Sequence, residues 1–212
     1  MKKAPDVTVV DYGMGNLNSV SKAVEKLGYK ALVSSQPQDV KAAVRLIVPG
    51  VGAFAKAMSE LRKRRLIAPL KAYLKSGRPF LGICLGYQIL FDESEEGGRP
   101  KGLGVFSGKV PRFRKAAKIP HMGWNQVHFA ARQARRCPLL KKMADGTDFY
   151  FVHSYYPVPK DRSLACLKTR YGETFASMIW KDNIFASQFH PEKSQADGLA
   201  ILDAFLKLNG GR

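Results

Sequence analysis

A cysteine at position 84 stands between two glycines directly after an apolar run, in the pentapeptide Gly82-Ile83-Cys84-Leu85-Gly86. The spacing is typical of a sharp turn between a strand and a helix, because the glycines let the chain turn and expose the side chain between them. At a helix N-terminus the helix dipole favours a thiolate, and the Leu85 N–H can face a developing oxyanion. The motif predicts a nucleophilic cysteine; a small buried cysteine in a tight turn is the alternative.

A nucleophilic cysteine needs a base, and the chain has four histidines. His190 stands out because it follows a predicted strand and is itself followed by Pro191 and Glu192. Residues two apart in an extended chain point the same way, so Glu192 can orient the imidazole while Pro191 stiffens the link. A nucleophile, a base and a carboxylate that holds the base form a catalytic triad. Cys84, His190 and Glu192 are therefore the predicted catalytic residues.

A glycine-rich segment, Val48-Pro49-Gly50-Val51-Gly52, ends another predicted strand. Its glycines allow backbone N–H groups to approach a substrate closely. In α/β enzymes such a loop often supplies the second donor of the oxyanion hole. The N–H of Val51 or Gly52 is therefore predicted to lie beside that of Leu85. An ordinary turn is the alternative.

No cofactor and no metal site is expected. Segment 13–18 follows a strand as a dinucleotide fingerprint would, but Asn18 replaces its third glycine. The three cysteines include no Cys-x-x-Cys pair, which argues against a zinc site and a disulfide framework and favours a reducing cytoplasm. The start, Met1-Lys2-Lys3, is basic, but the apolar run at 7–10 is too short for a signal-peptide core. No apolar run approaches bilayer length.

Short apolar strands alternate with amphipathic helices through the first part of the chain, which predicts a parallel sheet covered on both faces. From Gly102 to Gln188 closely spaced strands with turn signals predict an antiparallel extension of that sheet. The predicted fold class is α/β, with a mostly parallel central sheet flanked by helices, in one domain over 1–212. The predicted strands are 7–10, 29–34, 45–48, 79–83, 105–113, 124–129, 149–155, 164–169, 175–180 and 184–188. The predicted helices are 17–27 and about 54–65, 69–76, 85–91 and 195–208.

The chain is strongly basic, with 35 lysines and arginines against 17 aspartates and glutamates and a formal net charge of +18. Clustered basic residues can indicate phosphate contacts with nucleic acid. The clusters at 62–65, 109–118 and 132–136 match no nucleic-acid-binding motif, and Phe113 is the single aromatic residue within them. Solvated basic faces or an acidic protein partner are the preferred interpretation, and a nucleic-acid-binding protein is an alternative.

Taken together, the segments 49–52, 82–88 and 190–192 resemble the class I glutamine amidotransferases, and the resemblance covers nearly the whole chain. It implies that Cys84 attacks the side-chain amide of glutamine. His190 would accept a proton and then give it to the leaving ammonia, Glu192 would hold His190, and water would hydrolyse the glutamyl thioester.

The same resemblance implies residues that bind the amino-acid end of glutamine. Gln88 lies one turn past the nucleophile, where the family contacts this end of the substrate. His153, Ser154 and Tyr155 match, more loosely, a segment whose backbone helps to bind it. Gly50 is assigned to the same substrate-binding group.

Segments 11–17, 120–125 and 190–194 closely resemble one branch of this family. The branch supplies ammonia, through an internal passage, to a separate cyclase subunit folded as a (β/α)8 barrel, in a heterodimer of histidine biosynthesis. Two alternatives stay open. One is a related amidotransferase that feeds a surface-sugar synthase, and the other is a stand-alone cysteine hydrolase.

A partner that receives ammonia requires a sealed interface. Asn16 and Lys193 match positions near the partner in this branch. Met122 and Trp124 are large apolar residues in a segment rich in glycine and proline. They are predicted to be interface anchors, with Trp124 as the hot spot; ordinary core packing is the alternative.

Overall fold

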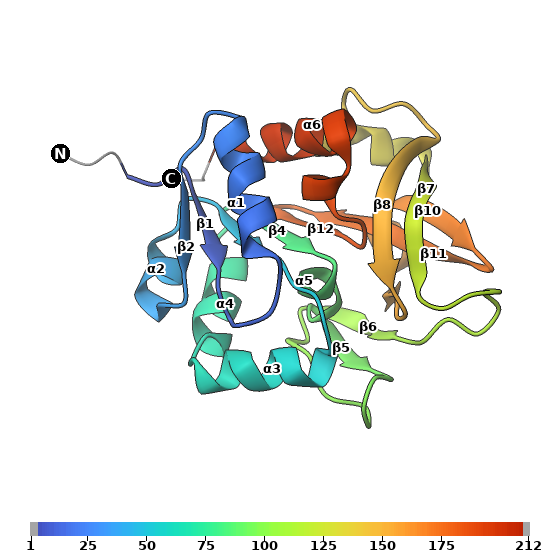
Figure 1. Cartoon of the computed structure of the whole chain (residues 1–212), viewed down its shortest axis with the longest axis horizontal. Helices are drawn as coiled ribbons and strands as arrows, with labels where there is room; N and C mark the ends of the chain where they lie inside the picture. The colour runs from blue at the N-terminus through green and yellow to red at the C-terminus, as the bar shows by residue number, and fades with distance from the viewer. Residues whose placement is uncertain (1–3, 210–212) are drawn as a thin grey trace.

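A computed structural model describes residues 4–209, so the basic residues 1–3 lie outside the described part. Within residues 4–209, nine strands form one sheet in the order β2-β1-β3-β4-β12-β11-β10-β7-β8 (Figure 1). The strands from β2 to β12 pair in parallel, and those from β12 to β8 pair antiparallel. This confirms the α/β class with its antiparallel extension. The strands are β1 (Val7–Val10), β2 (Ala31–Ser34), β3 (Leu46–Val48), β4 (Phe80–Ile83), β7 (His121–Phe129), β8 (Thr147–His153), β10 (Ala165–Tyr171), β11 (Glu173–Lys181) and β12 (Ile184–Ser187).

Helices cover both faces of the parallel half (Figure 1). Successive strand residues point to opposite faces, and the core divides accordingly into two clusters. Val9 and Ile47 belong to a cluster with residues of α1 and α6, whereas Val10 and Val48 pack with residues of α2, α3 and α4. Strands covered on both faces read as continuous apolar runs, which is why the sequence located them. The helices are α1 (Leu17–Lys26), α2 (Pro37–Ala42), α3 (Phe54–Lys63), α4 (Ile67–Leu74), α5 (Leu85–Gln88) and α6 (Gln195–Leu206).

Two local expectations are wrong. The helix expected over 85–91 ends at Gln88, because the chain at Leu103 and Val105 returns and donates N–H bonds to the carbonyls of Ile89 and Leu90, at 2.7 and 2.8 Å. The strand expected over 105–113 therefore joins a separate three-stranded sheet and not the main one. That sheet consists of β5 (Phe91–Ser94), β6 (Phe106–Val110) and β9 (Val158–Pro159), with β5 and β6 parallel.

Short elements complete the described part of the chain. The six-residue helix α2 was not predicted from the sequence, and Pro37 occupies its first turn. In the described part of the chain, none of the helices has the length and apolar character needed to cross a bilayer. The 3₁₀ helices are η1 (Arg132–Arg136), η2 (Pro138–Leu140), η3 (Arg162–Leu164) and η4 (Pro191–Lys193).

Candidate active site

The turn between β4 and α5 holds Cys84 in a strained backbone conformation, with φ 54° and ψ −105°. A residue other than glycine rarely adopts a positive φ, and such strain is often found at functional sites. The Cys84 N–H donates to the Ser187 carbonyl of β12 at 2.7 Å, which fixes the turn to the sheet. Both flanking glycines are needed, since a methyl group on Gly86 would collide with the Val48 carbonyl and one on Gly82 would lie 2.6 Å from the Gly86 carbonyl oxygen.

His190 and Glu192 form a buried pair just after β12. His190 Nδ1 lies 2.8 Å from Glu192 Oε1, and both side chains are 2% exposed. Because a carboxylate accepts, Nδ1 carries the proton. In the described part of the chain, the other ring nitrogen, Nε2, is buried and has no hydrogen-bond partner. It is therefore the atom free to exchange a proton with a neighbouring group.

The sulfur of Cys84 lies close enough to this pair to change the pKa of His190. Burial by itself lowers the pKa of His190, but the nearby sulfur of Cys84 and the Glu192 carboxylate outweigh it and raise the pKa to about 10. The imidazole is therefore charged at neutral pH when the sulfur beside it is a thiolate. A thiolate beside an imidazolium is the resting form of an activated cysteine nucleophile.

A cavity of about 330 Å³ opens beside Cys84. It is large enough to hold an amino acid such as glutamine, and it is lined by residues from distant parts of the sequence. Val51 and Gly50 are not part of its lining, although their neighbour Gly52 is. Besides Gly52, the predicted site residues that line it are Cys84, Leu85, Gln88, His153, Ser154 and Tyr155, and the other lining residues are Ala53, Glu96, Pro120 and Val152.

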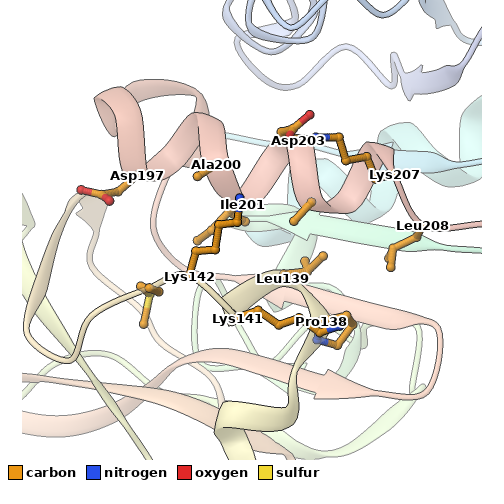
Figure 2. Close-up of a pocket in the computed structure, with 12 residues that line it drawn as sticks. Pro138, Leu139, Lys141, Lys142, Asp197, Ala200, Ile201, Asp203, Lys207 and Leu208 are labelled. Atoms are coloured by element: carbon orange, nitrogen blue, oxygen red, sulfur yellow. Dashed lines mark hydrogen bonds and ion pairs between the residues drawn. The ribbon is translucent and has the colours of Figure 1, made fainter.

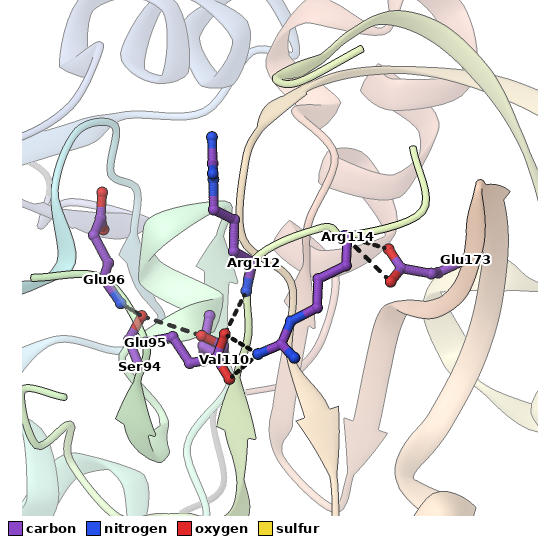
Figure 3. Close-up of polar contacts among 7 residues, drawn as sticks. All are labelled: Ser94, Glu95, Glu96, Val110, Arg112, Arg114 and Glu173. Atoms are coloured by element: carbon purple, nitrogen blue, oxygen red, sulfur yellow. Dashed lines mark hydrogen bonds and ion pairs between the residues drawn. The ribbon is translucent and has the colours of Figure 1, made fainter. Parts of the chain in front are cut away.

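Glu96 is a site residue that the sequence interpretation missed. Its carboxylate accepts the Phe54 N–H at 2.7 Å while the residue lines the cavity. Figure 3 shows it next to Ser94, whose hydroxyl accepts the Glu96 N–H at 3.1 Å. The signal that the sequence offered for Glu96 was an acidic residue within a strongly basic chain. Its position could not be predicted, because it depends on the small sheet formed by β5, β6 and β9.

One ion pair and two hydrogen bonds from backbone N–H groups link this small sheet to the main one (Figure 3). The Arg112 N–H donates to Glu95 at 3.2 Å, and the Arg114 guanidinium also reaches Glu95, at 3.2 Å. The backbone N–H of Arg114 in turn donates to Glu173 of β11 at 3.2 Å. Glu95 precedes Glu96, so these contacts help to hold the acidic group at the mouth of the cavity.

The oxyanion loop 49–52, predicted to supply an N–H of Val51 or Gly52 to an oxyanion hole, instead presents the Gly50 carbonyl to Leu85, an arrangement we call closed. The Leu85 N–H donates to the Gly50 carbonyl at 3.2 Å. The donor that should receive an oxyanion is therefore already occupied by a backbone acceptor. Gly52 has a φ of 104°, a conformation that favours glycine and that a side chain would strain.

A directed chain of hydrogen bonds enters the site from β7. His153 Nδ1 lies 2.8 Å from the Tyr155 carbonyl, which can only accept, so Nδ1 carries the proton and Nε2 accepts. His121 Nδ1 then donates to His153 Nε2 at 3.0 Å, and Asn125 Nδ2 donates to His121 Nε2 at 3.1 Å. One tautomer of each histidine is thereby fixed.

The hydrogen-bond network continues from Tyr155 to Cys84. The Tyr155 carbonyl also accepts from Gln88 Nε2 at 2.9 Å, and the same amide donates to Gln188 Oε1 at 3.1 Å. Gln188 Nε2 lies 3.5 Å from Cys84 Sγ. Gln188 was not among the predicted site residues. Gln88 is thus held rigidly from both sides, as a residue that orients a substrate needs to be.

Because His121 and His153 are buried, we expect the free energy of unfolding to decrease at acid pH. Burial lowers the pKa of His121 to about 4 and that of His153 to about 3, so both are neutral in the folded protein. The unfolded chain takes up these protons near pH 6.5, so the stability they contribute is complete above that pH and is lost as the pH falls. The raised pKa of His190 acts in the opposite direction, because its contribution still grows as the pH falls toward about 6.5 and is complete below that pH. The two buried histidines outnumber it, so a net loss of stability remains.

We expect the free energy of unfolding to fall between pH 7 and pH 5, by at most about 1.4 kcal/mol per pH unit for each histidine. Urea unfolding at a series of pH values measures it. A His121→Phe variant retains a ring to stack on Tyr171, 4.0 Å away between ring centres, and should show a shallower fall. The same slope in both proteins would contradict the assignment.

The predicted partner residues lie on the surface. Met122 is 63% and Trp124 49% exposed on β7, so neither is part of the core. Trp124 packs edge-on against Tyr150 of β8, with ring centres 6.2 Å apart, and Lys193 Nζ lies 5.7 Å from the centre of the same Tyr150 ring. Asn16 is exposed and caps α1 by accepting the Ser19 N–H at 3.3 Å. Trp124, Tyr150 and Lys193 thus form a continuous aromatic and cationic patch.

A second cavity, of about 370 Å³, lies between α6 and the segment 138–143 (Figure 2). Its floor is apolar, with Leu139 and Ile201 among the lining residues, and Asp203 and Lys207 at its edge form an ion pair. It contains none of the triad residues and no cysteine. The cavity beside Cys84 is therefore the candidate active site.

Comparison with known proteins agrees with this site. Residues 8–208 match the model of the glutamine amidotransferase class-I family. The chain is 47% identical over 206 residues to the imidazole glycerol phosphate synthase subunit HisH of Syntrophotalea carbinolica, covering 94% of this chain and 98% of that protein. It is 48% identical over 202 residues to the subunit of the same name from Moorella thermoacetica, covering 95% and 94%.

Solved structures share the fold at much lower identity. The structure of PurLQS from Thermotoga maritima superposes with a TM-score of 0.75 at 16% identity, covering 96% of this chain and 98% of that one. Identity this low supports the fold alone. The family match spans nearly the whole chain and the two relatives are close to half identical, so this chain belongs to the class I glutamine amidotransferase family.

Proposed function

We propose that this chain is the glutaminase subunit of imidazole glycerol phosphate synthase. It hydrolyses glutamine and delivers the ammonia to a (β/α)8-barrel cyclase subunit, which makes imidazole glycerol phosphate and aminoimidazole carboxamide ribotide in histidine biosynthesis. The observation that carries the activity is the convergence of Cys84 with the buried pair of His190 and Glu192 beside a cavity of amino-acid size. The names of the relatives support the pathway. A reducing cytoplasm suits an enzyme whose Cys84 must stay unoxidised.

The chemistry follows from the protonation states. The Cys84 thiolate attacks the side-chain carbonyl carbon of glutamine, and the carbonyl oxygen becomes an oxyanion. The protonated His190 gives its Nε2 proton to the amide nitrogen, the C–N bond breaks and ammonia leaves a glutamyl thioester. His190 then takes a proton from water, the hydroxide displaces the sulfur, and glutamate is released. Glu192 keeps the imidazole oriented through both proton transfers.

Recognition of glutamine uses the opposite end of the cavity. Glu96 provides a carboxylate for the α-ammonium group of the substrate, and the rigidly held Gln88 provides an amide. Residues 153–155 line the same cavity. An amino acid with free α-groups is therefore favoured over a glutamine side chain within a peptide.

The closed oxyanion loop indicates how activity is controlled. The glutamine oxyanion can use the Leu85 N–H only after the Gly50 carbonyl has left it. Rotation of the Gly50–Val51 peptide removes this carbonyl and turns the Val51 N–H toward the vacated position. A chain in the closed state is weakly active by itself, and we propose that the cyclase partner shifts the equilibrium toward the open state.

The test is glutamine hydrolysis with and without a histidine-pathway cyclase loaded with its ribotide substrate. We expect the rate to rise at least about tenfold, the effect of roughly 1.4 kcal/mol of coupling. Full activity without any partner would indicate a stand-alone hydrolase. A rise only with a surface-sugar synthase would place the chain in that pathway, and tight, salt-sensitive nucleic-acid binding with no glutaminase activity would overturn the proposal.

A further inference from the structure

Tyr12, just after β1, carries a buried hydroxyl that the site described so far leaves unused. The side chain is 0% exposed, and among the described residues its hydroxyl has no hydrogen-bond partner. An unpaired buried hydroxyl is unfavourable, because the group has lost water and gained nothing in exchange. The hydroxyl is therefore available to donate to a backbone acceptor that moves next to it.

The hydroxyl lies against the oxyanion loop. It occupies the space that a side chain at Gly50 would take, since a methyl group there would collide with the Tyr12 oxygen and lie 2.9 Å from Leu85 Cβ. The hydroxyl therefore adjoins the peptide whose carbonyl blocks the Leu85 N–H. Burial raises the pKa of Tyr12, and the nearby Cys84 raises it further, so the phenol stays protonated and can donate.

The segment after Tyr12 also packs on this loop. A methyl group at Gly15 would lie 3.3 Å from Gly50 Cα, and one at Gly52 would lie 2.8 Å from the end of the Met14 side chain. The next residue, Asn16, is exposed at the predicted partner surface. One short segment thus connects the surface of the protein to the loop that must rearrange.

We propose that Tyr12 is a positioning residue for the oxyanion hole, whose hydroxyl donates to the Gly50 carbonyl once the Gly50–Val51 peptide has rotated away from Leu85. This inference rests on the proposed function. In the closed state the carbonyl is paired with Leu85 and the hydroxyl is unpaired, whereas in the open state the hydroxyl replaces Leu85 as the donor. The Leu85 N–H is then free for the substrate, and the Gly50 carbonyl is not left unsatisfied.

The test is Tyr12→Phe with Tyr73→Phe as the matched control. Tyr73 is equally buried, on α4, but its hydroxyl donates to the carbonyls of Pro79 and Val44 at 3.0 and 3.3 Å. With saturating cyclase and ribotide, Tyr12→Phe should lower kcat for glutamine about tenfold, the scale of one hydrogen bond, at unchanged KM. Its Tm in the free chain should stay equal or rise, because an unpaired hydroxyl is removed. Tyr73→Phe should show the opposite pattern, with a lower Tm and normal kcat.

The outcomes separate the two proposals. If wild-type glutamine hydrolysis is not stimulated by the cyclase, the proposed function fails before Tyr12 is tested. If the wild type is stimulated and Tyr12→Phe is stimulated equally, the role of Tyr12 is overturned. A fall in kcat accompanied by a fall in Tm as large as that of Tyr73→Phe would also overturn it, since packing damage would explain both.

Discussion

Cys84→Ala is expected to lower glutamine hydrolysis by at least about 10³-fold, because the residues that remain cannot form a thioester. The cyclase reaction of the same complex, supplied with an ammonium salt, should continue at the wild-type rate. The reason is that Cys84 lies at the cavity that generates ammonia and has no part in its later use. Parallel assays with glutamine and with ammonium salt, on the assembled complex, measure both reactions.

Cys137→Ala is the matched control for this experiment. Cys137 is a free cysteine and fully buried like Cys84, but it lies next to η2 and does not line the active-site cavity. Both variants remove one buried sulfur, so their costs in stability are comparable. Loss of glutamine hydrolysis in both variants, or loss of the ammonia-dependent reaction in Cys84→Ala, would mean that packing and not nucleophilic chemistry is being measured.

Glu192→Gln is expected to lower kcat for glutamine by roughly 10²–10⁴-fold, the range of general acid–base catalysis, with little change in KM. The amide keeps the size of the side chain but removes the charge 2.8 Å from His190 Nδ1. The imidazolium then loses one of the two groups that raise its pKa, so the pKa of His190 should fall. The pH profile of kcat should shift with it, which a purely structural change would not produce.

Asp145→Asn provides the comparison for that change. Asp145 pairs with His128 at 2.9 Å, so the same kind of contact is altered, but the two side chains are 46% and 53% exposed and lie outside the active-site cavity. Its kcat and its pH profile should equal those of the wild type. If Glu192→Gln behaves like Asp145→Asn, the carboxylate is not part of the triad and His190 is oriented by other contacts.

Local sequence signals were reliable where each residue's environment is set by its own neighbours in the chain. The apolar run before Cys84 and the glycines around it require a strand followed by a tight turn, and the structure shows both, including the positive φ. The continuous apolar runs of β1 and β3, separated by amphipathic helices, were sufficient to predict a sheet covered on both faces. The predicted bounds of elements were wrong where distant segments compete for the same backbone groups. The Leu103 N–H, for example, donates to the Ile89 carbonyl, and α5 ends early.

The sequence by itself determined the strand–turn–helix around Cys84 and the α/β class, because each follows from periodicity and local sterics. The link between His190 and Glu192 was expected to be extended, but it is the 3₁₀ helix η4, which still places the Glu192 carboxylate 2.8 Å from His190 Nδ1. Only the tertiary structure decided that the sulfur of Cys84 lies next to His190, that Glu96 lines the cavity beside Cys84, and that the Gly50 carbonyl accepts the Leu85 N–H with the Tyr12 hydroxyl against the same glycine. These are contacts between segments tens of residues apart. Their geometry depends on how the sheet order brings strand ends together, and no local pattern encodes that distance.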